Sequence, residues 1–289
     1  MPTVPLSVRL STTTVEYRES GPKDSAYPPV VFVHGALVDS RLWDAVAADL
    51  AAQGFRCLQP DLPLGAHRIP VTDRAVLTPT GVAGLVHEFL AALDLENVTL
   101  VGNDTGGGIC QFLVDAHPER IGRLVLTNCD AFDKFPPFPF NAIFTLMRTR
   151  PSVTALMATM GPTALRHSPL GFGLLAKNLD PTLTASWLSP ARTDRRIAGD
   201  FAALARGIGR TDLTDVAQRL HRFAKPVTVV WGQDDRCFTP ALGRRLAALF
   251  PDATIVEVPA ASTFVPLDAP GAVSAAIRQA NTGIGSPNR

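Results

Sequence analysis

Short apolar runs alternate with longer amphipathic segments along most of the chain, a pattern typical of an α/β fold with a mainly parallel sheet. The first two runs, residues 5–10 and 13–20, predict a hairpin. Later runs predict strands over residues 28–35, 55–61, 97–104, 120–129, 226–235 and 254–259. Apolar positions at helical spacing predict helices over residues 42–53, 80–94, 106–117, 241–250 and 270–281.

The alternation breaks between residues 131 and 222, where the chain holds proline-punctuated, mostly helical stretches and no convincing strand. We therefore predict a helical cap over residues 131–222, inserted between two parts of one core, residues 1–130 and 223–289. The sequence FPPFPF at the start of the cap indicates a packed hinge or a cleft lining, or else a ligand for a polyproline-reading domain. The final residues, NTGIGSPNR, predict a loose tail.

Composition narrows the class of partner. The chain has 289 residues, of which 46% are hydrophobic, so it is long enough for one large globular domain. Its 27 basic and 26 acidic residues give a net charge of +1, which predicts neither a nucleic-acid nor a membrane partner but a small molecule. No apolar stretch approaches the length of a membrane-spanning helix, so we expect a cytoplasmic protein. We expect it to be monomeric or homodimeric.

Four scattered cysteines without metal-ligand spacing predict reduced core thiols: Cys57, Cys110, Cys129 and Cys237.

The sequence LVGNDTGGG, with its run of glycines after an apolar strand, contains the main candidate for a catalytic residue. Its glycines fit neither the dinucleotide-binding pattern nor the P-loop. Gly102, Asp104 and Gly106 instead have the small-x-nucleophile-x-small spacing of a nucleophile elbow, in which a strained turn between strand and helix presents a catalytic side chain. Taken alone, Asp104 is equally explained as a cap of the following helix.

With the segment VFVHG, where His34 and Gly35 end an earlier strand, the chain resembles the α/β-hydrolase superfamily over nearly its full length. Because its elbow carries an aspartate, the chain resembles the branch of the superfamily that contains haloalkane dehalogenases and epoxide hydrolases. The resemblance implies an eight-stranded, mostly parallel sheet with a cap, and catalysis without a metal or organic cofactor. It also implies an oxyanion hole from the N–H groups of Ala36 and Thr105, and a catalytic acid at Asp235 in the segment WGQDD.

In that branch a carboxylate attacks an sp3 carbon, and a histidine near the C-terminus then activates the water that releases the ester. Here the corresponding position holds Thr263, and no histidine follows His221. As a hypothesis, His67 supplies the missing proton transfer, because its loop leaves the carboxyl end of a core strand. His167 in the cap is a weaker candidate. Losing general base catalysis typically slows a reaction ~10²–10⁴-fold.

The resemblance also implies substrate contacts that this chain lacks in their usual form. Its two tyrosines, Tyr17 and Tyr27, lie far before the cap, and the halide-holding tryptophan that usually follows the nucleophile is replaced by Thr105. We assign substrate binding to His34 and to Trp187 of the cap, although core packing explains the tryptophan equally well.

Three functions stay open at this point. The first is a hydrolase of a small or medium apolar substrate, in which Asp104 attacks a halide- or epoxide-type carbon or activates water. The second is a non-hydrolytic enzyme, such as a cyclase or isomerase, in which a buried Asp104 acts as a general acid or base. The third is a ligand-binding protein that has lost turnover. The intact elbow and the HG loop favour an enzyme, whereas the missing histidine favours the other two.

Overall fold

The computed structural model describes residues 5–282 and contains one eight-stranded sheet in the order β1-β2-β4-β3-β5-β6-β7-β8. Strand β2 pairs antiparallel with β1 on one side and with β4 on the other, and every other pair is parallel. This confirms the predicted fold class and the opening hairpin. The strands are β1 (Leu6–Arg9), β2 (Thr14–Ser20), β3 (Val30–Val33), β4 (Cys57–Pro60), β5 (Val98–Asp104), β6 (Ile121–Cys129), β7 (Val227–Gly232) and β8 (Ala253–Val258).

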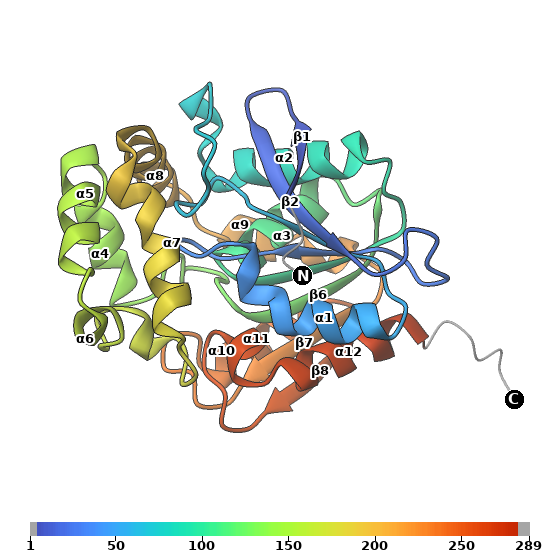
Figure 1. Ribbon diagram of the computed structural model, residues 1–289. Helices are drawn as coiled ribbons and strands as arrows, with labels where there is room; N and C mark the ends of the chain where they lie inside the picture. The colour runs from blue at the N-terminus through green and yellow to red at the C-terminus, as the bar shows by residue number, and fades with distance from the viewer. Residues whose placement is uncertain (1–4, 283–289) are drawn as a thin grey trace, which may run out of the picture.

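Helices cover both faces of the sheet, as a parallel sheet requires. Helices α1 and α12 contact each other on one face, and α2 packs beside α3 on the other (Figure 1). The core helices are α1 (Asp44–Ala52), α2 (Pro79–Ala92), α3 (Thr105–Ala116), α9 (Thr214–Ala217), α10 (Pro240–Ala247), α11 (Val265–Asp268) and α12 (Pro270–Thr282). Short 3-10 helices are η1 (Ser40–Trp43), η2 (Arg74–Val76), η3 (Phe172–Leu174) and η4 (Leu220–Arg222).

The strands of the sheet centre consist of apolar and β-branched residues because both of their faces are covered. All four residues of β3 are completely buried, whereas most of the edge strand β8 is exposed. The four cysteines are free and buried, as the sequence predicted. None of the helices between residues 5 and 282 is both long enough and apolar enough to cross a membrane. The predicted loose tail lies outside the described residues, except for its first two positions, which continue α12.

The order of strands reverses direction at β3, which lies between β4 and β5 in the sheet although it precedes both in the chain. The loops that leave the carboxyl ends of β3 and β5 therefore diverge, and an open α/β sheet binds its ligands at such a switch point. The HG loop follows β3, and the elbow follows β5. The fold thus brings together two motifs that lie about 70 residues apart in the chain.

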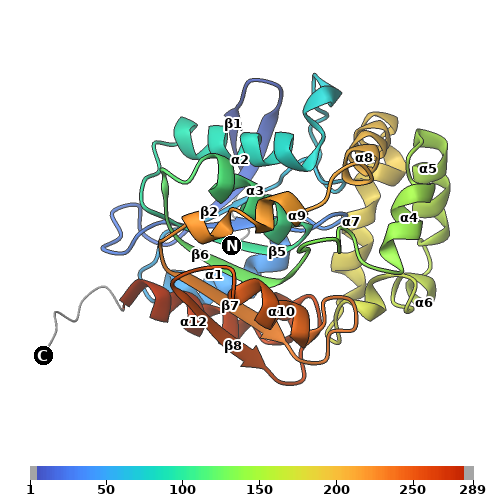
Figure 2. The same cartoon turned by 180° about the vertical axis from the view of Figure 1, so that it is seen from behind.

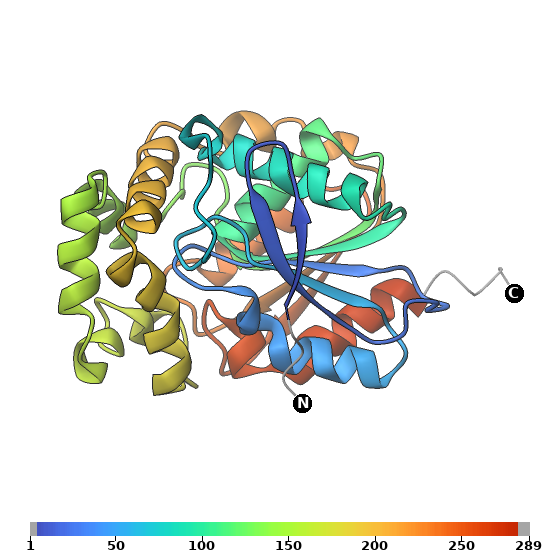
Figure 3. The same ribbon diagram turned by 45° about the horizontal axis from the view of Figure 1, so that its top comes forward.

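The segment between β6 and β7 contains helices and no strand of the sheet. Helices α4 to α8 form a separate layer at one end of the sheet, seen from opposite sides in Figures 1 and 2 and with the top of the molecule tilted forward in Figure 3. The last part of the predicted cap segment differs, because α9 and η4 pack against α3 of the core. The cap helices are α4 (Phe140–Leu146), α5 (Arg150–Thr159), α6 (Thr163–Arg166), α7 (Pro181–Thr193) and α8 (Arg195–Ile208).

Candidate active site

Asp104 lies on a tight turn between β5 and α3. Its backbone has φ 54° and ψ −132°, a conformation that is unfavourable for a residue with a side chain and that marks functional sites. Glycines make the turn possible: a Cβ at Gly106 would lie 2.3 Å from the carbonyl oxygen of Val33, and one at Gly102 would lie 2.7 Å from the sulfur of Cys110. The local geometry is therefore that of the elbow which the sequence spacing predicted.

The HG loop approaches the Asp104 carboxylate from β3. A Cβ at Gly35 would lie 2.1 Å from Asp104 Oδ2, so only glycine leaves room for the carboxylate. The backbone N–H groups of Thr105 and Ala36 both act on this carboxylate and lower its pKa. The two amides predicted from sequence thus converge on one carboxylate.

His34 positions one of these amides. Its Nδ1 donates to the Gly35 carbonyl at 2.9 Å, while its Nε2 accepts from the Leu62 N–H at 2.9 Å. The Gly35 carbonyl and the Ala36 N–H belong to the same rigid peptide plane, so anchoring the oxygen aims the N–H. Burial lowers the pKa of His34, which is fully enclosed, so the ring stays neutral in this tautomer. His34 does not line the cavity above Asp104, contrary to the substrate-binding role predicted for it.

Asp104 has an unusual acidity for an aspartate. The residue is partly buried and lines the cavity. Its pKa is raised to about 7, mainly by burial and to a smaller extent by the charge of Asp235, and the amides of Thr105 and Ala36 offset part of the rise. At neutral pH the group is therefore divided between a carboxylate and a carboxylic acid.

Asp235 lies on the loop after β7 and is almost completely buried. Its Oδ1 accepts the backbone N–H groups of Cys237 and Phe238 at 2.7 and 2.9 Å, and its Oδ2 accepts the Asn128 amide at 2.7 Å. The Thr263 hydroxyl donates to the same Oδ2 at 2.9 Å. Burial raises the pKa of Asp235, which these hydrogen bonds only partly offset. Thr263 is thus a buried hydrogen-bond partner of the Asp235 carboxyl group.

Sequence reasoning missed a third carboxyl group, that of Asp130, which directly follows β6. The Asp130 N–H approaches the Asp104 carbonyl at 3.4 Å, so the two residues are neighbours across adjacent strand ends. Asp130 is fully buried, and neither carboxyl oxygen has a hydrogen-bond partner within residues 5–282. Burial and the charge of Asp104 raise the pKa of Asp130 well above its usual range, and the Thr105 side chain offsets this only in part. Burial thus favours the protonated, neutral form of the Asp130 carboxyl group. Its place at the carboxyl end of a parallel strand was the signal that could have revealed it.

The cavity above Asp104 lies between the core and the cap. Asp104, Ala36 and Thr105 form its polar end, and most of its wall is aliphatic, aromatic or thioether. Its empty volume, counting the part open to solvent, is about 710 Å³. The apolar wall includes Phe140, Phe144, Met147, Met157, Phe172 and Leu188.

Arg166 of α6 is the charged cap residue in this cavity wall. Its guanidinium donates to three backbone carbonyls and to the hydroxyls of Thr163 and Thr184, and no carboxylate of the described chain pairs with it. Its hydrogen-bond donors are thus occupied by other residues of the cap. The neighbouring His167 is bound to Thr184 as well, at 2.9 Å, and does not line the cavity.

Two predicted site residues lie elsewhere. The Nε2 atom of His67 faces the Asp200 carboxylate at 3.4 Å, and its Nδ1 accepts from the Gly65 N–H at 3.3 Å, so both ring nitrogens have partners away from the cavity. The Trp187 indole donates to Asp39 at 3.0 Å, and its fully buried ring packs in the core. The structure therefore does not bring His67 or Trp187 to Asp104, and we do not retain either one in the site.

Comparisons with known proteins agree with this architecture. Residues 28–270 match the alpha/beta hydrolase fold family, and the chain belongs to this family. It is 30% identical to the 2-hydroxy-6-oxononadienedioate/2-hydroxy-6-oxononatrienedioate hydrolase of Cupriavidus pinatubonensis, over 78% of this chain and 76% of that one. It is 27% identical to haloalkane dehalogenase 2 of Mycobacterium bovis, over 86% of each chain.

Solved structures show the same fold. The enol-lactonase of Burkholderia xenovorans superposes with a TM-score of 0.74 at 22% identity, covering 95% of this chain and 99% of the other. The named relatives are hydrolases that act on different bonds. The prediction of an enzyme of the hydrolase class is thus confirmed.

Proposed function

We propose that this hydrolase acts on a small or medium apolar molecule with an electrophilic sp3 carbon, of the alkyl halide or epoxide type, and that Asp104 is the nucleophile. The observation that carries the proposal is the Asp104 carboxylate itself, fixed on a strained turn at the polar end of an apolar cavity. A carboxylate in such surroundings is poorly solvated and is aimed at whatever the cavity holds.

In the first step, an Asp104 carboxylate oxygen bonds to the substrate carbon as the bond to the leaving group breaks. A halide leaves as an anion and needs no proton, whereas an epoxide oxygen needs a proton donor as the ring opens. No tyrosine or tryptophan lines the described cavity, and the Arg166 donors are already engaged. The described wall thus lacks a proton donor for an epoxide oxygen and also the indole donor that usually holds a leaving halide. We expect the halide to react faster, because it leaves without a proton transfer.

In the second step, water attacks the carbonyl carbon of the ester. The N–H groups of Ala36 and Thr105 would form the oxyanion hole for the charge that develops on the carbonyl oxygen. The attacking water must also lose a proton, and the residue beside Asp235 that would take it is Thr263, whose hydroxyl is no base. We therefore expect the ester to form faster than it is released.

One observation favours a second candidate for the role of Asp104. A pKa of about 7 is well suited to a general base, so Asp104 would activate water directly for attack on the substrate, with no covalent ester. The two candidates differ in the origin of the oxygen atom that reaches the product.

The test exposes the protein to alkyl bromides of three to eight carbons and to the matching terminal epoxides, and measures intact mass and product. We expect a mass gain equal to the alkyl group on the native chain and none on Asp104→Asn, with bromides more reactive than epoxides. Asp24→Asn, a change at an exposed aspartate, is the control and should behave as the native chain.

The same reaction in H₂¹⁸O separates the two roles. After several turnovers through an ester, the peptide that contains Asp104 gains ¹⁸O, because water attacks the aspartate carbonyl carbon. Product without an adduct and without ¹⁸O in Asp104 would support the general-base role. The absence of both adduct and product with every compound would refute the proposed substrate class.

A further inference from the structure

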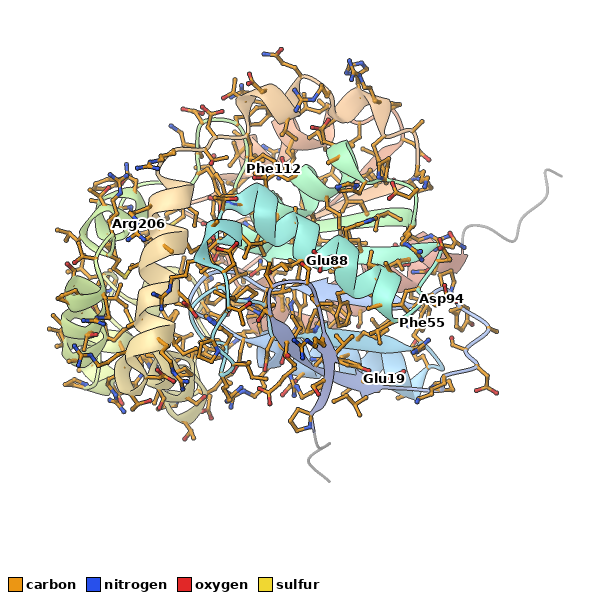
Figure 4. All side chains as sticks on the ribbon, turned by 90° about the horizontal axis from the view of Figure 1, so that it is seen from above. Glu19, Phe55, Glu88, Asp94, Phe112 and Arg206 are labelled. Atoms are coloured by element: carbon orange, nitrogen blue, oxygen red, sulfur yellow. The ribbon has the colours of Figure 1, made fainter. Side chains whose placement is uncertain are left out.

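We propose that His87, His117 and Glu119 form a binding site for one transition-metal ion of the Zn²⁺ type, on the face of the molecule that α2 covers. His87 lies within α2, His117 follows the last residue of α3, and Glu119 lies in the connection from α3 to β6. Helices α2 and α3 lie side by side, and Figure 4 marks them by Glu88 on α2 and Phe112 on α3.

Three possible ligand atoms converge at this place. The Nδ1 atoms of His87 and His117 lie 3.5 and 3.9 Å from Glu119 Oε1, and one ligand atom from each residue lies within 4.8 Å of the other two. Nitrogen and oxygen ligands at 2.0–2.1 Å from a tetrahedral zinc ion are separated by about 3.3 Å. The two histidine–glutamate pairs must therefore move closer by less than about an ångström, and the two imidazoles by at most about 1.5 Å, to share one ion.

The side chains are free to make this adjustment. The two imidazole rings are stacked with their centroids 4.3 Å apart, so they must rotate before both Nδ1 lone pairs point at one ion. Their side chains are 28% and 44% exposed, and Glu119 is 56% exposed, which leaves room for rotation. His87 Nδ1 is itself buried and has no hydrogen-bond partner in the described chain, so no existing bond opposes coordination.

The chemistry of the ligand set selects the class of ion. Two imidazoles and one carboxylate suit Zn²⁺, Co²⁺, Ni²⁺ or Cu²⁺, whereas Mg²⁺ and Ca²⁺ prefer oxygen ligands throughout. The fourth position would be filled by water, because no fourth side chain among residues 5–282 joins the group.

The site is independent of the proposed hydrolase mechanism. Helix α3 begins next to Asp104 and ends next to His117, and its 12 residues separate the two by about 18 Å. A bound ion would join α2 to the connection between α3 and β6, and would thereby stabilise the folded chain. Ion binding and thermal stability are therefore the proper measurements, and neither depends on what Asp104 does.

The test uses tag-free protein treated with EDTA and then dialysed, titrated with ZnCl₂ by calorimetry and with CoCl₂ by visible absorption. We expect one ion per chain, a tetrahedral Co²⁺ spectrum and a higher melting temperature with Zn²⁺. His87→Gln, His117→Ala and Glu119→Gln should each weaken binding at least about tenfold, and circular dichroism checks that each variant is folded.

The control is His221→Ala, which removes a histidine on η4 outside the cluster and should leave binding unchanged. Absence of binding by the native chain would refute the site. Binding that survives all three cluster substitutions, or that falls with His221→Ala instead, would also overturn it. His117→Ala is the most informative single variant, because His117 is more exposed than His87 and its removal disturbs the packing less.

Discussion

The two halves of the candidate site are held by different kinds of contact. The Asp104 half depends on the backbone: a strained turn, glycines that allow close approach and two amide N–H groups. In the Asp235 half, two backbone N–H groups bind one carboxyl oxygen and the side chains of Asn128 and Thr263 bind the other. The side chain at position 263 decides whether a proton acceptor lies beside Asp235. The comparison teaches that backbone geometry fixes the Asp104 half, whereas a change of one side chain would alter the chemistry of the Asp235 half.

The largest expected effect comes from restoring that partner. Thr263→His places an imidazole beside Asp235, which already accepts a hydrogen bond from this position. Because a general base typically contributes ~10²–10⁴-fold, we expect release of the alkyl ester to accelerate by that order. Adduct decay followed by intact mass measures the effect.

The matched control for that change is Thr263→Val, which removes the hydroxyl and adds no base, and it should not accelerate release. Because Thr263 is fully buried, thermal melting of both variants shows whether the larger side chain is accommodated. A folded Thr263→His variant with unchanged decay would mean that the two halves are not linked as proposed.

The next largest effect tests the backbone half. In Gly35→Ala the new Cβ would lie 2.1 Å from Asp104 Oδ2, so the carboxylate or the amide of Ala36 must move. Removing one oxyanion-hole donor costs ~10²–10³-fold, and we expect a loss of that order in the release step and slower ester formation. Gly84→Ala on α2 is the control, because its Cβ would meet no atom within 4 Å. Equal rates of ester formation and release for the two variants would contradict the close approach of Gly35 to the Asp104 carboxylate.

A pH profile sharpens the assignment of Asp104. The nucleophile must be ionised, and its pKa is about 7, so the rate of ester formation should fall about tenfold per unit below pH 7. We expect a rate at pH 5 about 100-fold below the plateau above pH 8. Mass-resolved single-turnover kinetics provide the measurement. A rate that instead decreases with rising pH would indicate that the protonated form is the active one.

The same carboxyl group should reduce stability at neutral pH. Its folded-state pKa of about 7 lies above the ordinary value of 3.8, so the folded state holds the proton more tightly. The stability that this tighter proton binding adds is fully present below about pH 4 and is lost as the pH rises to 7. Asp104→Asn should therefore be more stable than the native chain at pH 8, by about 4 kcal/mol at most, and equally stable at pH 4. Urea unfolding at the two pH values tests this, with Asp24→Asn as the control.

The smallest expected effect on catalysis belongs to His67. His67→Ala should change the rates of ester formation and release by less than about twofold, because its ring nitrogens face Gly65 and Asp200 and not the cavity. It should lower stability by about 1–3 kcal/mol, since buried Asp200 loses a partner. A large decrease in the rate of ester release, without a decrease in stability, would show that His67 takes part in catalysis.

Much of this site was predictable from local sequence. The apolar runs of β3 and β5, the spacing of Gly102 and Gly106 around Asp104 and the HG loop each predicted what the structure shows. These features are encoded by residues close together in the chain, because steric limits on the backbone act over a few residues.

Side-chain partners were not predictable in this way. His67 meets Asp200 across 133 residues, and Trp187 meets Asp39 across 148, so no local pattern marks either pair. Packing of the cap against the core decides these contacts and turns two predicted site residues into structural ones. The burial of Asp130 beside Asp104 likewise depends on the neighbouring strands and helices together.

The sequence by itself therefore determined the fold class, the elbow and the absence of a histidine at position 263. Only the tertiary structure decided which polar groups face the cavity, what burial does to their pKa values and which distant residues meet, as His87 and His117 do. The physical reason is one of range: backbone geometry is fixed by neighbours in the chain, whereas desolvation and side-chain pairing are fixed by neighbours in space.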